Sequence, residues 1–150
     1  MGNSHRVAVG VGGNLAAAVS NRLGGAAVLG QVLMYPVTDC GVDNGEPEAA
    51  SMVTYASGYL LTAAAMRDFR RAYAARDARM HFPYAAPAVN AVTGRRYAPD
   101  AAARAHPDCA VLRAAAGVLA AAPRARVILA AGDVLLDEGR ACVRRRCRLL

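Results

Sequence analysis

The stretch RVAVGVGGNLAAAVSNRL, residues 6–23, has the residue types of a turn that carries chemistry. An apolar run at residues 7–9 meets the glycines Gly10, Gly12 and Gly13 and passes at once into a helix-like run. Such a turn either holds a phosphate on backbone amides at a helix N-terminus or raises a nucleophile on a strand-to-helix elbow. The nucleophile requires a serine, and the apex of this turn has none.

A dinucleotide-binding turn is one alternative for the same glycines. Its fingerprint is G-x-G-x-x-G or G-x-G-x-x-A, in which Gly10 and Gly12 fit but Leu15 occupies the last position. The acid expected at the end of the next strand would be Asp39, which comes a little late. A dinucleotide-binding domain is therefore the less favoured interpretation.

The segments around the turn alternate between strand and helix patterns. Short apolar runs that are typical of strands covered on both faces in a parallel sheet lie at residues 7–9, 28–35 and 127–130. Helix-like runs lie at residues 14–22, 62–75, 112–122 and 137–146. Thr62 stands at an N-cap position, and the last run has acids in its first turn and arginines in its last. This order predicts an α/β fold.

Residues 39–108 interrupt the alternation. Both ends of this stretch are rich in Gly, Pro, Asn and Asp, and its middle contains a helix pattern. Met66, Phe69 and Tyr73 in that pattern have the i, i+3, i+7 spacing of one apolar helix face. An insertion of this size between two sheet strands predicts a helical cap rather than a second sheet.

The charge of the chain is concentrated near its end. All 18 basic residues are arginines, the net charge is +7, and five of the arginines lie at positions 140, 144, 145, 146 and 148. Without these five, 13 basic against 11 acidic residues leave only +2. We therefore expect a solvated or disordered basic tail at residues 143–150 and no nucleic-acid partner; binding of an anionic partner by these arginines is the less favoured alternative.

Cysteine and histidine spacing excludes the common metal motifs. The four cysteines, Cys40, Cys109, Cys142 and Cys147, form no C-x-x-C pair, and no histidine lies at zinc-finger spacing. Reduced and mostly buried thiols in a cytoplasmic protein, with no metal and no cofactor, are the expectation. No apolar run approaches the ~20 residues that cross a bilayer and no signal peptide is recognisable, so no membrane partner is expected.

Five sequence segments, in this order along the chain, resemble the hormone-sensitive-lipase-like family of α/β-hydrolases, which comprises the fold-3 carboxylesterases and lipases. They are RVAVG with GGNLAAAV, GQVLMYPVTD, GYLLTAAAMRDFRRAY, PYAAP and VILAAGDVLLDEG. The resemblance covers most of residues 6–142 and implies a partial α/β-hydrolase fold, with parallel strands flanked by helices and a cap insertion at about 40–108. It also implies carboxylic esters of short or medium acyl chains as the substrate class.

The family's elbow reads G-D-S-A-G-G-N, and its serine is the nucleophile. Counting back from GGN without a gap places Val11 at the Ala and Gly10 at the Ser. Aligning the preceding strand instead deletes three residues, including the Asp and the Ser. Both alignments lose the nucleophile. Ser4 and Ser20 fall before the strand and inside the helix, where we expect surface or capping residues.

The resemblance assigns the acid of the catalytic triad to Asp133, the first Asp of DVLLDEG, just after the third strand. Val134 and Leu136 replace the family's Pro and Arg at this place, whereas the DEG of residues 137–139 remains. A helix N-cap or a turn acid is the other interpretation of Asp133. Of the oxyanion donors, the backbone amide of Val11, which follows the nucleophile position, is retained.

The remaining catalytic parts of the family have no counterpart in this sequence. The family's histidine follows the aspartate and its His-Gly-Gly-Gly loop precedes the elbow, and neither is present. His81 lies in the cap and His106 before the third strand, so neither takes the place of the base by sequence order. Loss of the nucleophile alone lowers kcat by about a millionfold in a serine protease.

We therefore expect a truncated copy of the family that is catalytically incompetent on its own. A non-catalytic ligand- or partner-binding module of the same fold is the alternative. Because strands and helices of the family are missing, sheet edges and an apolar face would be uncovered. Marginal stability is the expectation unless the chain forms a homo-oligomer.

Overall fold

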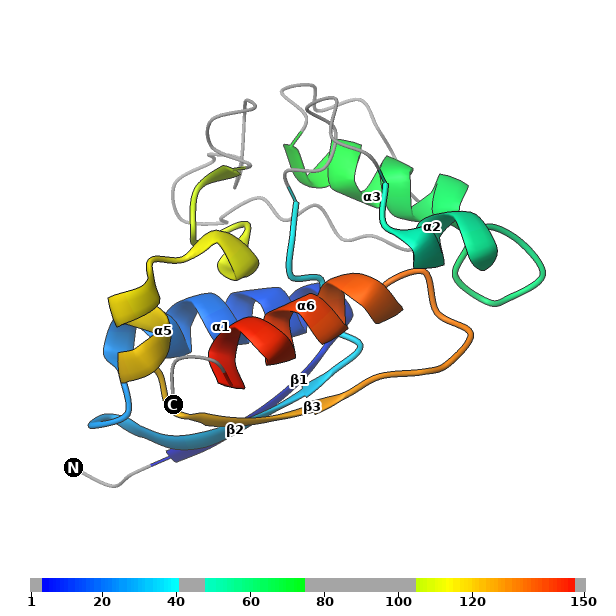
Figure 1. Ribbon diagram of the computed structural model, residues 1–150. Coiled ribbons are helices and arrows are strands. Elements are labelled where there is room, and N and C mark those ends of the chain that lie inside the picture. Colours follow the sequence, from blue (N-terminus) through cyan, green and yellow to red (C-terminus); the bar gives the residue numbers. More distant parts are fainter. Residues whose placement is uncertain (1–3, 41–47, 75–104, 148–150) are drawn as a thin grey trace.

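A computed structural model describes residues 4–40, 48–74 and 105–147 (Figure 1). Its strands β1 (Ser4–Val9), β2 (Val28–Met34) and β3 (Arg124–Ile128) form one parallel sheet in the order β1-β2-β3. Val9 pairs with Met34, which in turn pairs with Ile128. The carboxyl ends of the three strands therefore lie at one edge, and the α/β expectation is confirmed.

Helices pack on one face of this sheet (Figure 1). They are α1 (Gly10–Leu23), α2 (Ala50–Thr54), α3 (Ala63–Ala74), the 3-10 helix η1 (Val111–Arg113), α5 (Ala116–Ala121) and α6 (Leu136–Cys147). α1 and α6 lie next to the sheet, whereas α2 and α3 stand farther from it. None of the described helices is long and apolar enough to cross a membrane.

Two buried clusters hold these layers together. The first joins Ala17 and Ala18 of α1 to Leu33 of β2 and to Val111, and the small alanines let the helix approach the sheet closely. The second joins the cap helices to the start of α6 and consists of Val37, Cys40, Met52, Ala63, Met66, Cys109, Val134 and Leu135. Burial of these apolar side chains is the main stabilising contribution.

The cap helix α3 confirms the expected pattern. The Thr62 hydroxyl accepts a hydrogen bond from the amide of Ala65 at 3.1 Å, as an N-cap does. Met66 is buried, and Phe69 packs against the second cluster. The side chain of Tyr73 and residues 41–47 and 75–104 of the insertion lie outside the described residues.

Element boundaries differ from the expected ones at several places, among them β1, which begins at Ser4 rather than residue 7. α1 begins at Gly10 rather than residue 14, because the glycines themselves form its first turn. The run 112–122 splits into η1 and α5, since Ala114 and Ala115 are extended (ψ 147° and 149°). β3 starts three residues early, because alternation of Arg with Ala and Val marks a strand covered on one face only.

The end of the chain also differs from the expected basic tail. α6 continues through Cys147, with Asp137 and Glu138 in its first turn and arginines in its last. Arg145 donates hydrogen bonds to the carbonyls of Leu112 and Ala114, the latter at 2.8 Å. Residues 143–147 are thus helical, and the guanidinium groups of Arg145 and Arg146 bind loop carbonyls, while residues 148–150 lie outside the described part.

The second face of the sheet is not covered by any described element, in contrast to the expected burial on both faces. Val7 and Val9 of β1 are 69% and 55% exposed, and Ile128 of β3 is 38% exposed. The apolar pattern of the strands therefore indicates two buried faces, of which the described helices cover only one.

Candidate active site

The elbow between β1 and α1 contains no intervening loop. Val9 is extended (φ −123°, ψ 142°), and the next residue, Gly10, opens α1 with φ +56°. A residue with a side chain rarely adopts this left-handed conformation. A Cβ at Gly10 would meet no atom within 4 Å, so the apex has room for a side chain. The open, left-handed apex has the geometry of a nucleophile elbow, although glycine adopts it without strain.

The two following glycines differ in their surroundings. A Cβ on Gly13 would lie 3.0 Å from the Cβ of Pro36, so only glycine lets α1 pass so close to the chain after β2. A Cβ on Gly12 would meet only the Cβ of Ala8, at 4.0 Å, which is an ordinary contact. Gly13 is therefore required by packing, and Gly12 is not.

Asn14 connects the elbow to two distant loops. Its amide nitrogen Nδ2 donates to the carbonyls of Val37 at 2.9 Å and Cys109 at 2.6 Å, and the side chain is fully buried. No local sequence pattern predicts a role for Asn14. Its signal was the GGN phrase, in which the asparagine directly follows the glycine that packs against Pro36.

Tyr35 is a second backbone irregularity at this edge of the sheet. Its φ is +47°, and among the residues that the structure describes it is the non-glycine residue with a positive φ. Tyr35 follows Met34, and Met34 pairs with the residue before Gly10, so the two left-handed residues are neighbours across the strands. Backbone strain of this kind clusters at functional sites.

The backbone amide of Val11 lies in the first turn of α1. Amides of a first helical turn have no acceptor within the helix, and they carry the positive end of the helix dipole. Such an amide can donate to a developing oxyanion next to the apex.

Asp133 lies in the turn between β3 and α6. Its Oδ1 accepts the amide of Leu135 at 3.0 Å, and its carbonyl accepts the amide of Leu136 at 3.1 Å. These bonds organise the turn before α6, which is the geometry of a turn acid; α6 itself begins at Leu136, so Asp133 is not its N-cap. Gly10 and Asp133 each follow the carboxyl end of a strand, β1 and β3 respectively. Because the strands of the sheet are parallel, these two ends lie at the same edge of the sheet.

Other candidate nucleophiles and bases lie away from the apex. Ser20 is fully buried, which corrects the surface or capping expectation: it lies one turn after Ala17 on the packed face of α1. Ser4 is the first residue of β1 rather than lying before the strand. His106 is exposed, with Nδ1 3.4 Å from Oδ2 of Asp108, and His81 lies outside the described residues.

A buried ion pair lies behind the elbow, between the cap and α6. Glu138 Oε1 accepts the amide of Thr38 at 2.8 Å, and its Oε2 accepts a hydrogen bond from Arg70 of α3. Both side chains are almost completely buried. Burial raises the pKa of Glu138 to about 7 despite the lowering effects of the Arg70 charge and the Thr38 amide. In the sequence, Glu138 is distinguished only as part of the DEG segment at residues 137–139.

The start of α6 is also tied to α2. The Ser51 hydroxyl donates to the carbonyl of Val134 at 2.8 Å, and the Ser51 amide donates to Asp137 Oδ2 at 2.8 Å. Together with the ion pair, these bonds fix the cap to the turn that contains Asp133. Within residues 4–40, 48–74 and 105–147, no three His, Cys, Asp or Glu side chains gather as metal ligands would.

A family model described as alpha/beta hydrolase fold matches residues 3–99, which is well over half of the chain. No curated protein matches the chain.

Solved esterases superpose on nearly the whole chain. A thermostable esterase from Pseudomonas putida is 30% identical with a TM-score of 0.71, over 97% of this chain and 37% of its own. An esterase from Rhizomucor miehei is 32% identical with a TM-score of 0.70, over 95% and 36%. Carboxyl esterase 2 from Tuber melanosporum, at 23% identity and a TM-score of 0.71, shares the fold over 98% and 40%. The chain thus spans about two fifths or less of these structures.

Proposed function

The chain belongs to the hormone-sensitive-lipase-like family with the α/β-hydrolase fold, and we propose that it carries the elbow and acid of a carboxylic ester hydrolase without hydrolysing esters by itself. The observation that carries this proposal is Gly10. It occupies the left-handed apex of the strand-to-helix elbow, where the family has its serine, and it has no hydroxyl. Acyl transfer through a covalent intermediate requires a nucleophile at that apex.

The other parts of the site keep their proposed roles. The amide of Val11 is the oxyanion donor next to the apex, and Asp133 is the acid after β3. The glycines Gly12 and Gly13 complete the elbow. An acid orients a catalytic histidine and stabilises its charged form, so it supplies no turnover without a nucleophile. Esters are the substrate class that the esterase names of the structural neighbours suggest. Short or medium acyl chains are what the resemblance to the family implies.

The test is hydrolysis of p-nitrophenyl butyrate by the purified chain. We expect the rate to equal the buffer rate, and to stay there in Asp133→Ala. The control is Gly117→Ala, a substitution in α5 that touches no other atom within 4 Å. Turnover well above buffer in the parent chain and in Gly117→Ala, with loss in Asp133→Ala, would overturn the proposal.

A non-catalytic binding module is the second candidate. The observation that favours it is the cap: α2 and α3 are fixed to the start of α6 by Ser51 and by the buried Arg70–Glu138 pair. A cap fixed in this way is suited to covering a ligand above the elbow. Calorimetric titration with butyrate and with ethyl butyrate tests it, and absence of heat with both, together with an unfolded circular dichroism spectrum, contradicts it.

A further inference from the structure

Cys40 and Cys109 lie at the two ends of the cap insertion. They flank the helices α2 and α3 and are 69 positions apart in the chain. Both thiols are free and only 3% exposed, and both belong to the buried cluster between the cap helices and the start of α6. A bond between these two sulfur atoms would close the insertion at its base.

The segments that contain the two cysteines lie side by side. Asn14 Nδ2 donates to the carbonyls of Val37 and Cys109, at 2.9 and 2.6 Å. The amide of Leu112 donates to the carbonyl of Thr38 at 3.0 Å. Neighbouring chains joined by hydrogen bonds have Cα atoms about 5 Å apart, and a disulfide spans about 4.4–6.8 Å between Cα atoms. The backbone thus brings residues 37–40 and 109–113 to the spacing that a disulfide requires.

The two thiols also interact with each other. Burial raises the pKa of Cys40 to about 12, and the charge of Cys109 is the next contribution, ahead of that of Glu138. An ion pair of 3.1 Å between Asp39 and Arg113 holds the two segments together beside this pair. Burial likewise raises the pKa of Cys109 to about 11. A dithiol is a strong oxidant as its disulfide when its reduced form is stabilised as a thiolate, and here burial removes that stabilisation.

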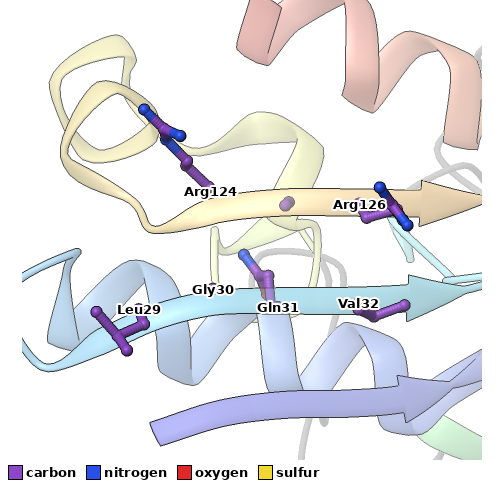
Figure 2. A pocket seen from close by; sticks show the side chains of 7 residues that line it. Leu29, Gly30, Gln31, Val32, Arg124 and Arg126 are labelled. Atoms are coloured by element: carbon purple, nitrogen blue, oxygen red, sulfur yellow. The ribbon is translucent and has the colours of Figure 1, made fainter. Parts of the chain in front are cut away.

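The surroundings of the two thiols favour a bond between them over a lasting adduct. The cavity of about 460 Å³ along β2 and β3, which Figure 2 shows beside Val32 and Arg126, borders neither cysteine. Cys40 and Cys109 are instead packed among apolar side chains. A bulky group attached to either sulfur would have to displace the packed cap, whereas a disulfide between the two adds no atoms.

We propose that Cys40 and Cys109 form a reversible disulfide at the base of the cap insertion, with a small disulfide such as oxidised glutathione as the oxidant. When the cluster opens, one cysteine thiolate attacks the glutathione disulfide and releases one glutathione thiolate. The second cysteine attacks the protein sulfur of this mixed disulfide and releases the other. The two protein thiols lose two electrons and two protons, and one oxidised glutathione becomes two reduced molecules. The elbow glycines take no part, so the proposal is independent of the esterase assignment.

The test is the thiol–disulfide equilibrium of the full chain in mixtures of reduced and oxidised glutathione, with and without urea. Acid quenching and alkylation precede trypsin digestion and mass spectrometry. Cleavage after arginine places Cys40 in peptide 23–67 and Cys109 in peptide 105–113, apart from the other two cysteines. We expect these two peptides to be linked. Half oxidation should require about tenfold less oxidised glutathione without urea, because the folded chain holds the two segments together.

Two double variants with two buried thiols each test the choice of partner. Cys142→Ser with Cys147→Ser keeps Cys40 and Cys109 and should retain the linkage. Cys109→Ser with Cys147→Ser keeps Cys40 and Cys142, which are also both buried, and should form no intramolecular disulfide under the same conditions. A different pairing in the parent chain overturns the proposal. So does an equal requirement for oxidised glutathione with and without urea, because the fold then does not bring these sulfur atoms together.

Discussion

Asn14 and Cys109 are 95 positions apart in the chain, yet the Asn14 amide nitrogen lies 2.6 Å from the Cys109 carbonyl oxygen. The same nitrogen donates to the Val37 carbonyl at 2.9 Å. One side chain at the elbow thus satisfies the carbonyl after β2 and the carbonyl that precedes η1. A buried carbonyl without a donor is costly, so this amide fixes both loops against α1.

Asn14→Ala is expected to lower the free energy of unfolding by about 1–3 kcal/mol, because it leaves two buried carbonyls without their donor. Asn14→Asp should cost at least as much, since a carboxylate oxygen would face both carbonyls. Urea unfolding followed by circular dichroism measures the change. The control is Asn21→Ala on the same helix, whose Oδ1 makes no hydrogen bond to the described residues. An effect of Asn14→Ala no larger than that of Asn21→Ala contradicts the prediction.

The elbow apex provides a second prediction. Gly10→Ala should destabilise the chain by about 1–2 kcal/mol, because Gly10 has φ +56° and a side chain there strains the backbone. No steric term adds to this cost, since the new Cβ meets no atom within 4 Å. Gly117→Ala in α5 is the matched control, as its Cβ also meets no atom and its φ is not positive.

The control substitution Gly117→Ala should change the stability of the chain in the opposite direction. Gly117 lies in the first turn of α5, where alanine is favoured over glycine by at most the ~0.5–1 kcal/mol of a helix interior, so Gly117→Ala should slightly raise the midpoint of urea unfolding. If both substitutions shift the midpoint in the same direction, the left-handed backbone at Gly10 is not what sets its residue type.

The sequence predicted these features unequally. Thr62 as an N-cap and the acids and arginines of α6 follow local rules, and the structure shows both. The buried state of Glu138 could not be predicted, because its partner Arg70 lies 68 positions away and charged residues are usually exposed. The sequence predicts β3 at residues 127–130, three residues later than it begins in the structure. The exposed arginines at its start interrupt the apolar run, because the strand is covered on one face only.

The candidate site divides in the same way. Glycines beside a strand indicated a sharp turn, and the turn is there, with Gly10 at its apex. The roles of Gly13 and Asn14 depend on packing between segments. Gly13 contacts Pro36, and Asn14 reaches Val37 and Cys109, through contacts between segments that no local pattern encodes. Periodicity identifies an element, but the residues that fix one element on another depend on distant partners.

Glu138 makes stability depend on pH. Burial raises its pKa from the ordinary 4.5 to about 7 in the folded chain, so between these values the folded state holds a proton that the unfolded state releases. Stability should therefore fall as pH rises from about 5 to 7.5, and the loss ends above the folded pKa. The charged groups that face Glu138 are Arg70 and Asp39, and Asp39 in turn pairs with Arg113.

Urea midpoints across this pH range measure the effect. Glu138→Gln keeps the shape of the side chain without its titration, so the slope should disappear in this variant. Glu48→Gln is the control: a hydrogen bond from Arg67 lowers the pKa of Glu48, so its titration falls below the window. A slope that persists in Glu138→Gln assigns the pH dependence to another group.

The cysteines should react in two classes. Cys40, Cys109 and Cys142 are buried, and burial raises the pKa of Cys40 to about 12 and that of Cys109 to about 11, whereas Cys147 is exposed at the end of α6. The thiolate is the reactive form, so the three buried thiols are protected by both access and protonation. Ellman's reagent at mildly alkaline pH should titrate one thiol in the native chain and four in denaturant.

Cys147→Ser identifies the reactive thiol. The native variant should show no fast reaction, while its denatured form still shows the three remaining thiols. Cys142→Ser, which removes a buried cysteine of the same helix, should keep the fast phase. Rapid reaction of more than one thiol in the native parent chain would mean that at least one of Cys40, Cys109 and Cys142 is accessible to solvent, and would contradict the prediction.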